Sequence, residues 1–283
     1  MSLVRSLARV PALNRAVKWS LDALPYAPRR FFNDLIRNGV RRPPPFSGVY
    51  SSFEDVPNVC YPADETRYEF ARSGLTVRRD EASDLVILGR QHTLLPMAVG
   101  MARKPNLRIL DFGGSGGIDF VGVREATSGS EIKYHVVETP ATCAAGRSLW
   151  PDEPAISFSE TMPDEAERFD IVYSWSSVQY VSNPIELLVS FTRYCPEAVL
   201  ICASPFAKKA FVRMQGRGKI RYPQWVISLP DARRAMAEAG YELTFFSTDE
   251  NEYNVDNFDS EHRVAHSAML LFMRQGGRPG TKQ

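Results

Sequence analysis

The chain has 283 residues, a formal net charge of +1, 44% hydrophobic residues and 24% charged residues. This is the composition of an ordinary soluble globular protein, with one large domain and an appendage or two domains at most. The net charge gives no indication of a nucleic-acid partner, and no uncharged apolar run approaches the ~18–20 residues that a membrane helix needs. We therefore expect a cytoplasmic protein whose mature form is the whole chain.

The four cysteines, Cys60, Cys143, Cys195 and Cys202, lie far apart and form no C-x-x-C pair. Four widely spaced cysteines in a chain of this length do not indicate a disulfide scaffold, and no metal-ligand spacing is present. The sequence therefore predicts reduced thiols and no metal site.

Residues 1–45 concentrate the positive charge, with nine basic residues and two acidic ones. Residues 3–24 place apolar side chains at three- to four-residue intervals with basic residues between them, which is typical of an amphipathic helix. Such a helix packs on its own domain or on a second copy, as in a homodimer, more often than it lies peripherally on the inner face of a membrane. Three consecutive prolines at 43–45 predict the end of this basic helical extension.

Residues 46–104 predict a lead-in segment, with few periodic signals up to residue 82 and a helix over residues 83–101. From residue 105 onward, buried strands alternate with helices. Strands are predicted at 107–110, 134–137, 156–158, 169–174, 198–203, 241–247 and 267–274, and helices at 118–126, 141–149, 183–194 and 230–239.

This alternation predicts an α/β fold with a doubly wound, mostly parallel seven-stranded sheet over residues 105–274. No helical pattern separates the last two strands, so we expect them to pair as an antiparallel C-terminal hairpin at the sheet edge. Residues 275–283 are predicted to be a disordered tail.

The strongest motif is a glycine-rich turn between the first strand and its helix, Asp111-Phe112-Gly113-Gly114-Ser115-Gly116-Gly117. Glycines there let the backbone approach a ligand closely, and the helix N-terminus offers free N–H groups. A P-loop is excluded because Ile118 follows the last glycine, where Lys and then Ser or Thr would be required. The dinucleotide pattern G-x-G-x-x-G fits poorly, because Asp119 stands where a third glycine would be and would face a pyrophosphate.

The turn fits the pattern D-x-G-x-G-x-G, with Ser115 in place of the middle glycine. Its acidic residue, Asp111, suits S-adenosyl-L-methionine, which carries an ammonium and a sulfonium but no phosphate. Glu138, at the end of the second strand, is placed to accept hydrogen bonds from both ribose hydroxyls. It lies somewhat farther along the chain than the ~20 residues usual for a ribose-binding acid. We predict S-adenosyl-L-methionine as the cofactor.

With these motifs the chain resembles the class I methyltransferase superfamily. More narrowly, it resembles a family of methyltransferases encoded among bacterial surface-polysaccharide genes. The resemblance covers roughly residues 46–274 and rests on the segments 46–55, 110–114, 137–140, 174–184, 222–223 and 240–241. It implies a Rossmann-like methyltransferase fold and a small or glycan-like acceptor, with a role in surface-polysaccharide biosynthesis.

Ligands in open α/β sheets bind beyond the carboxyl ends of the strands, so the end of the fourth strand is expected to face the methyl group. Gln179 and Tyr180 follow this strand and are the candidate catalytic residues, which would orient the acceptor. Many small-molecule methyltransferases have a histidine near the position of Gln179, and a glutamine cannot act as a base. The alternative interpretation is that Tyr180 is a packing residue and Gln179 a helix cap.

The predicted cofactor-binding residues lie at the ends of four strands. The region after the third strand often contacts the adenine amine in such enzymes. The full set is Asp111, Gly113, Gly114, Ser115, Gly116, Gly117, Glu138, Thr139, Ser159, Glu160 and Ser174.

Two further clusters contain polar residues. Arg213, Gln215, Tyr222 and Trp225 lie after the fifth strand, where acceptor lids are usually inserted. The other cluster surrounds two histidines, and a solvated acidic loop is the favoured interpretation; its members are Asp256, Asp259, Glu261, His262 and His266.

The predicted function is methyl transfer from S-adenosylmethionine to a small or glycan-like acceptor, with a hydroxyl favoured over an amine. One alternative is an NAD-dependent sugar-nucleotide oxidoreductase or epimerase, which would have no antiparallel terminal hairpin. The other is a non-catalytic protein of the same fold that binds a partner or a membrane through residues 1–45.

Overall fold

The computed structural model describes residues 45–81, 94–102, 104–126, 131–217, 219–248 and 252–276. All of them belong to one of the two units into which the chain divides, Pro45–Gln283. The predicted basic amphipathic extension and nearly all of the predicted tail lie outside the described residues.

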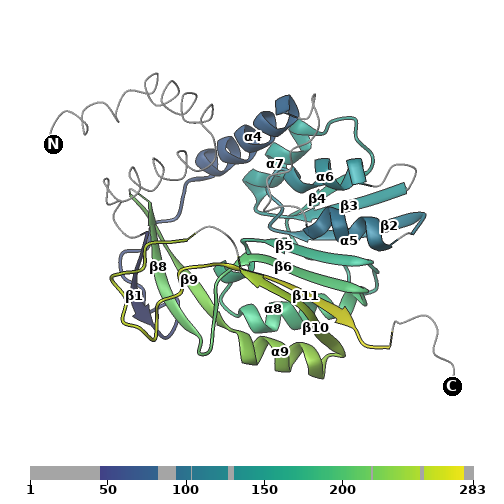
Figure 1. The fold of residues 1–283 in the computed structure, drawn as a ribbon. Helices are drawn as coiled ribbons and strands as arrows, with labels where there is room; N and C mark the ends of the chain where they lie inside the picture. The colour runs from purple at the N-terminus through teal and green to yellow at the C-terminus, as the bar shows by residue number, and fades with distance from the viewer. Residues whose placement is uncertain are drawn as a thin grey trace, which may run out of the picture. The chain divides into compact units, whose positions relative to one another are not determined.

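The larger of two sheets has seven strands in the order β10-β11-β6-β5-β2-β3-β4 (Figure 1). Five neighbouring strands are parallel, while β11 pairs antiparallel with both β6 and β10. This confirms the predicted mostly parallel sheet with an antiparallel C-terminal hairpin at its edge. The strands are β2 (Asn106–Phe112), β3 (Glu131–Val137), β4 (Ile156–Ser159), β5 (Ile171–Trp175), β6 (Ala198–Ser204), β10 (Tyr241–Thr248) and β11 (Ala268–Arg274).

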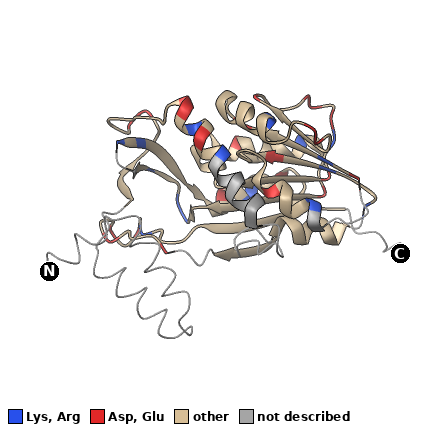
Figure 2. Cartoon of the chain, turned by 90° about the horizontal axis from the view of Figure 1, so that it is seen from above, with Lys and Arg blue, Asp and Glu red and all other residues tan. Residues whose placement is uncertain are grey.

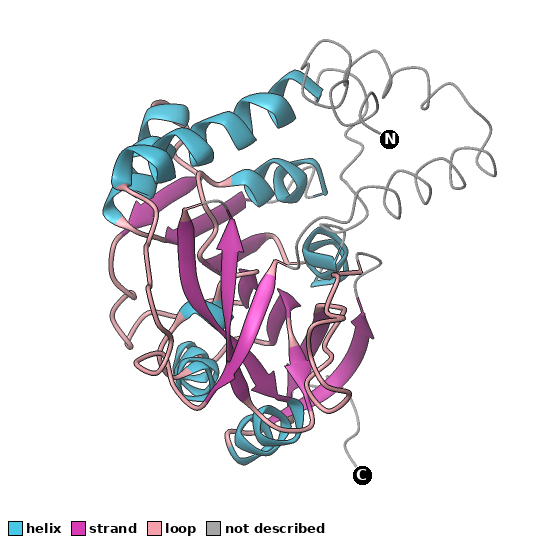
Figure 3. Cartoon of the chain, turned by 90° about the vertical axis from the view of Figure 1, so that its left-hand side faces the viewer, coloured by secondary structure: helices cyan, strands magenta, loops and turns pink. Residues whose placement is uncertain are grey.

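Helices cover both faces of this sheet (Figure 3). On one face, α5 (Leu94–Ala102), α6 (Ile118–Ala126) and α7 (Pro140–Leu149) contribute to an apolar core around Phe120, Tyr134 and Trp150. On the other face, α8 (Pro184–Phe191) and α9 (Leu229–Glu238) pack around Leu188 and Met236. Because both faces are covered, a central strand such as β6 is buried along almost its whole length and is nearly all apolar.

The starts of α8 and α9 follow from their capping residues. The Asn183 side chain accepts a hydrogen bond from the Glu186 amide, and the Ser228 side chain accepts one from the Asp231 amide. A proline stands in the first turn of each helix, where its missing N–H would be unpaired in any case. The short 3-10 helix η3 (Thr192–Tyr194) continues from α8, so the two together match the helix predicted over 183–194.

A second sheet was not predicted, and it has the order β1-β8-β9-β7. It consists of β1 (Phe46–Tyr50), β7 (Phe206–Ala207), β8 (Phe211–Arg217) and β9 (Ile220–Ser228). β1 comes from the segment before the large sheet and pairs antiparallel with β8, which follows β6. A third apolar cluster joins this cap sheet to the segment between β10 and β11; it contains Phe46, Phe211, Val226, Val255 and Phe258.

The lead-in segment also differs from the prediction. Residues 64–81, expected to show little regular structure, form the 18-residue helix α4 (Asp64–Glu81). Its sequence is rich in charged residues and poor in apolar ones, which makes the helix inconspicuous in the sequence. Of the helix predicted over residues 83–101, the structure describes the part from Leu94 onward as α5, and residues 82–93 lie outside the described part.

Two further observations concern the described part of the chain. Figure 2 shows Lys and Arg interspersed with Asp and Glu along the helices and loops of the described part. Within that same part, no helix combines the length and the apolar character needed to cross a membrane.

Candidate active site

The glycine-rich turn lies between the end of β2 at Phe112 and the start of α6 at Ile118. Gly113 and Gly117 have φ angles of +74° and +81°, a region that residues with a Cβ adopt only with strain. Ser115 has a φ of +54°, which explains why the pattern that it interrupts usually has a glycine at this position. The turn is held by hydrogen bonds from the Gly113 amide to Val137 O and from the Gly117 amide to Gly114 O.

Close packing against other parts of the protein accounts for these glycines. A Cβ on Gly113 would lie 2.1 Å from Ser177 Oγ, and one on Gly114 would lie 2.0 Å from Asp111 Oδ2. A Cβ on Gly117 would lie 2.5 Å from Ile156 Cδ1. The glycines are therefore needed by the fold itself, and their presence alone does not identify a ligand.

Glu138 directly follows β3 and turns back toward the glycine-rich turn. One of its carboxylate oxygens accepts a hydrogen bond from the Ser115 amide at 3.2 Å, and the other accepts one from the Thr139 amide at 2.8 Å. Burial raises the pKa of Glu138, while these two backbone donors and the charge of Arg67, on α4, act in the opposite direction. Each oxygen keeps a lone pair, so this half-buried carboxylate has the capacity to bind two hydroxyl groups.

Asp111, at the end of β2, is fully buried beneath the turn. Its Oδ2 accepts a hydrogen bond of 2.6 Å from the phenol of Tyr134, and its Oδ1 has no hydrogen-bond partner among the described residues. Asp119 lies nearby, where it accepts a hydrogen bond from the Tyr173 phenol. Burial, followed by the charge of Asp119, raises the pKa of Asp111 well above its ordinary value of 3.8.

This raised pKa predicts a pH dependence of folding. The folded state holds the Asp111 proton more tightly than the unfolded state does, so its stabilising effect is complete below about pH 4 and is lost as the pH rises through the folded-state pKa. We expect Asp111→Asn to remove this loss, so that the difference in unfolding free energy between variant and wild type shifts in favour of the variant as pH rises from 4 to 8. Urea unfolding across this range measures the shift, with the exposed Asp152→Asn as the control. Parallel pH profiles for Asp111→Asn and wild type would contradict the assignment.

Serines at the end of β5 support the turn from the other side. Ser174 is buried, and its hydroxyl donates to the carbonyl of Phe112 at 2.9 Å. The Ser177 hydroxyl donates to the carbonyls of Gly113 and Trp175. Ser176 and Ala203 at the ends of β5 and β6 have φ angles of +53° and +52°. Strained backbone of this kind collects at functional sites, and here it lies at the carboxyl edge of the sheet.

The residues after β3 and β4 occupy the region next to Glu138. Thr139 is the N-cap of α7, and its hydroxyl pairs with that of Thr142 at 2.9 Å. The Ser159 hydroxyl is engaged by His135 Nε2 and by the carbonyl of Thr161, at 2.8 and 2.7 Å. Glu160 is exposed. Of the residues predicted after the third strand, the Glu160 carboxylate is the one that is free to face solvent or a ligand.

Gln179 and Tyr180 lie on the 3-10 helix η2 (Val178–Tyr180). Gln179 is buried, where it accepts a hydrogen bond from Ser204 at 2.8 Å and donates one to Ser176 at 3.1 Å. It therefore joins the ends of β5 and β6 to each other. Tyr180 is half-buried and extends to the cap sheet, where its hydroxyl donates to Gln215 Oε1 at 2.7 Å.

The structure brings together three of the four residues predicted for the acceptor lid. Arg213 and Gln215 lie on β8, and the ring of Tyr222 on β9 meets the ring of Tyr180 edge to face at 5.3 Å between centroids. Trp225 lies next to Gln224 on β9, and its indole donates to the carbonyl of Ser182. Gln224, which links Arg213 to Tyr180, was not singled out in the sequence. Its role depends on the register of β8 against β9, which pairs Arg213 with Gln224.

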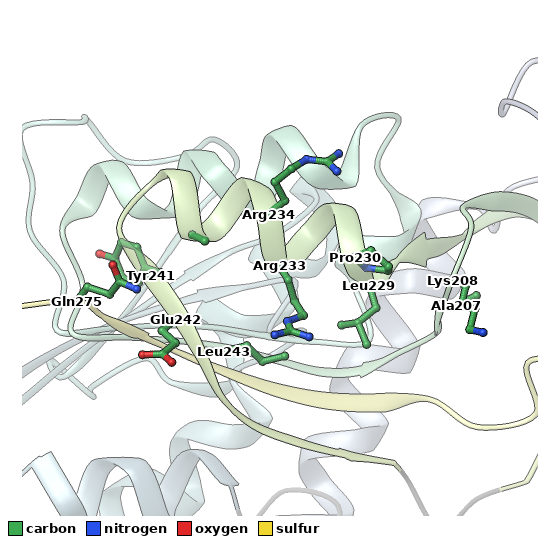
Figure 4. A pocket seen from close by; sticks show the side chains of 11 residues that line it. Ala207, Lys208, Leu229, Pro230, Arg233, Arg234, Tyr241, Glu242, Leu243 and Gln275 are labelled. Atoms are coloured by element: carbon green, nitrogen blue, oxygen red, sulfur yellow. The ribbon is translucent and has the colours of Figure 1, made fainter.

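The predicted histidine cluster lies on the surface, away from the glycine-rich turn. His262 Nδ1 lies 2.8 Å from Asp259 Oδ1, and its ring meets Phe211 edge to face. Lys209 pairs with Glu261 at 2.9 Å. His262, Lys209 and Glu261 border an open hollow of about 550 Å³. Another hollow of about 550 Å³ lies against α9 and β10, where Arg233 extends over Glu242 and Leu243 (Figure 4). The residues of the glycine-rich turn line neither of them.

Three solved structures are similar to the chain. The chain is similar to a protein provisionally named a methyltransferase, in complex with the Haloferax volcanii Trm112 methyltransferase activator, with a TM-score of 0.50 and 15% identity over 77% of this chain and 99% of that one. Magnesium protoporphyrin IX methyltransferase from Synechocystis PCC 6803, with bound SAH, gives a TM-score of 0.47 and 10% identity over 75% and 94%. Burkholderia thailandensis 1,6-didemethyltoxoflavin-N1-methyltransferase gives 0.45 and 12% over 77% and 92%.

No family model matches the sequence, and no curated protein matches it significantly. At 15% identity, the likeness to the Haloferax volcanii chain shows a shared fold. The predicted Rossmann-like methyltransferase fold is thereby confirmed. Any inference about the activity, the cofactor and the acceptor depends on the residues of the site.

Proposed function

We propose that the protein is an S-adenosylmethionine-dependent methyltransferase that acts on the hydroxyl of a small or glycan-like acceptor. The observation that carries this proposal is the position of Glu138. Its half-buried carboxylate follows β3 and lies across from Ser115 in the glycine-rich turn, with a free lone pair on each oxygen. A vicinal diol, such as that of a ribose, matches this arrangement.

The charges around the turn fit a cationic cofactor. Asp119 lies in the first turn of α6, and Glu138 lies beside Ser115. A pyrophosphate placed here would meet these carboxyl groups at close range, whereas an ammonium or a sulfonium would be stabilised by them. The residues present therefore fit S-adenosylmethionine better than a dinucleotide.

Each group has a distinct role in this proposal. When bound, the cofactor supplies an activated methyl group on sulfur. Glu138 binds the ribose hydroxyls, the amides of the turn lie along the cofactor, and Glu160 is positioned for the adenine amine. Asp111 and Ser174 are buried, so they support the turn and do not contact the cofactor directly.

The acceptor is placed where η2 and the cap sheet meet. Gln179 is fully engaged with Ser176 and Ser204, so it orders the strand ends, and Tyr180 is the residue that faces the acceptor. Methyl transfer from a sulfonium depends mainly on alignment and exclusion of water, so a strong base is not required at this position. The glycan-like acceptor and the role in surface-polysaccharide biosynthesis follow from the family resemblance of residues 46–274.

The two alternatives are weaker. A dinucleotide-dependent oxidoreductase or epimerase would lack the antiparallel pairing of β10 with β11 and of β11 with β6. A non-catalytic protein of the same fold would have no reason to keep a buried carboxylate cluster at the turn, since burying such groups lowers stability.

An isothermal titration separates the three possibilities. We expect S-adenosylmethionine and S-adenosylhomocysteine to bind the full-length protein, and NAD to give no heat. Folded protein that gives no heat with either S-adenosyl compound at millimolar concentration would overturn the proposal. Binding of NAD in their place would favour the oxidoreductase.

A further inference from the structure

A chain of hydrogen bonds runs from a buried arginine on the cap sheet to Tyr180. Arg213 Nε donates to Gln224 Oε1 at 2.8 Å. Gln224 Nε2 donates to the Tyr180 hydroxyl at 3.1 Å and to Gln215 Oε1 at 2.9 Å. The Tyr180 hydroxyl in turn donates to Gln215 Oε1 at 2.7 Å. The chain therefore joins β8, β9 and η2.

The chemistry of arginine fixes the direction of every bond in this chain. A guanidinium has only donors, so Gln224 must present its oxygen to Arg213 and its nitrogen to Tyr180 and Gln215. Gln215 then has to receive the Gln224 amide with its oxygen, and the same oxygen receives the Tyr180 proton. The opposite orientation of the Gln224 amide is ruled out, because it would place the NH₂ group of Gln224 against the Nε–H of Arg213, and two donors cannot form a hydrogen bond.

Arg213 is held firmly enough to impose this direction. It is 1% exposed, its Nη1 donates to the carbonyl of Val264 at 3.1 Å, and its Cζ lies 3.5 Å from the centroid of the Phe46 ring. Burial lowers its pKa to about 10, so the guanidinium remains protonated at neutral pH. Among the described residues, no carboxylate forms an ion pair with Arg213, which contacts neutral oxygens and an aromatic ring.

The fixed direction leaves specific groups available to a ligand. The Tyr180 hydroxyl donates a hydrogen bond to Gln215 and accepts one from Gln224, so one lone pair on its oxygen remains to accept a further hydrogen bond. The oxygen of Gln215 is used twice, so its amide nitrogen remains, and that nitrogen donates. Both residues are partly exposed.

We propose that Arg213 is a positioning residue that sets the hydrogen-bond polarity of the acceptor subsite. In that subsite Tyr180 accepts a hydrogen bond from the acceptor's O–H or N–H, and Gln215 Nε2 donates to a neighbouring oxygen. The ligand class is a neutral compound with two adjacent hydroxyl groups, such as a glycoside diol. A methyl acceptor whose only polar group is a carboxylate has no proton to donate to the Tyr180 oxygen. The identity of the subsite rests on the proposed function, but the polarity of the chain does not.

The polarity is tested first without any ligand, by NMR of the glutamine side-chain amides in the full-length protein. We expect the two Nε2 protons of Gln224 to exchange with solvent at least about tenfold more slowly than those of Gln215, because each of the two Gln224 protons is hydrogen-bonded. Arg213→Lys keeps a donor at this position and should retain the difference, whereas Arg213→Met should abolish it. Arg221→Met is the matched control, since Arg221 is an exposed arginine on the adjacent strand β9.

Equal exchange of the two amides in the wild type would overturn the proposal, as would an unchanged difference in folded Arg213→Met. If Arg213→Met does not fold, Gln224→Glu serves instead. That substitution keeps an oxygen facing Arg213 but removes both donors, so the ¹³Cζ resonance of Tyr180 should move, and it should stay in place in Arg221→Met. An unmoved resonance in Gln224→Glu would also overturn the proposal.

The ligand class is tested by methyl transfer from labelled S-adenosylmethionine to methyl glycosides with adjacent free hydroxyls, to their mono-deoxy derivatives and to simple carboxylates. We expect transfer to the diols, and a KM that rises at least about tenfold in Arg213→Met with unchanged affinity for S-adenosylhomocysteine. Transfer to the carboxylates in preference to the diols would overturn the ligand class. Wild-type protein that does not bind S-adenosylhomocysteine would refute the proposed function, while the amide exchange would still decide the polarity.

Discussion

We expect Glu138→Ala to weaken the binding of S-adenosylhomocysteine by about 5- to 150-fold. This range corresponds to about 1–3 kcal/mol, the free energy for hydrogen bonds to a charged group. The carboxylate is half-buried and aligned by the Ser115 and Thr139 amides, so its removal takes away a prearranged acceptor for two hydroxyls. It also leaves the Ser115 amide without its partner. Isothermal titration with the full-length protein measures the change directly.

Two variants show whether the effect belongs to the carboxylate at this position. Glu131→Ala removes an exposed carboxylate from the opposite end of the same strand, and it should leave the affinity unchanged. Glu138→Gln keeps the shape of the side chain, but its NH₂ group would oppose one of the two backbone amides, so weakened binding is again expected. If Glu138→Ala bound S-adenosylhomocysteine as tightly as wild type, the ribose would have been misplaced and the role of Glu138 would have to be withdrawn.

The second large effect is expected for Gly114→Ala, which should lower the free energy of unfolding by about 2–6 kcal/mol. The new Cβ would lie 2.0 Å from Asp111 Oδ2 and 2.4 Å from its Cγ. Asp111 cannot move away easily, because it is fully buried and bonded to the Tyr134 phenol. The expected loss combines overpacking, at about 1–3 kcal/mol, with the weakening of a buried hydrogen bond, at about 1–3 kcal/mol.

Gly100→Ala is the matched control for this substitution. Gly100 lies on α5, and a Cβ there would meet nothing within 4 Å. Because alanine favours a helix over glycine, this variant should be as stable as wild type or more stable by up to about 1 kcal/mol. Urea unfolding followed by circular dichroism measures both variants. A Gly114→Ala protein as stable as Gly100→Ala would show that Asp111 is free to move.

The sequence alone was sufficient to predict most of the large sheet. Buried strands such as β6 are apolar along their length, and α8 and α9 carry local start signals in Asn183 and Ser228. These features are local, because a run of apolar residues or a capping side chain acts within a few positions along the chain. For the same reason, the glycine-rich turn and the acid at the end of β3 were recognisable before the structure was known.

The second sheet and helix α4 were not predicted, for different reasons. β1 is a short strand whose partner β8 lies far along the chain, and strand pairing across such a distance leaves no local pattern. α4 is rich in charged residues and poor in apolar ones, so no apolar run marks it as an element that packs on the core.

The sequence by itself determined the fold class and the position of the candidate cofactor site, because both follow from short-range patterns at strand ends. Only the tertiary structure decided what the individual side chains do. It placed Asp111 beneath the turn with Tyr134 and bonded Gln179 to Ser176 and Ser204. It also brought Arg213 into line with Tyr180 through Gln224. Such contacts depend on burial and on the register between distant strands, which are set only when the whole chain has packed.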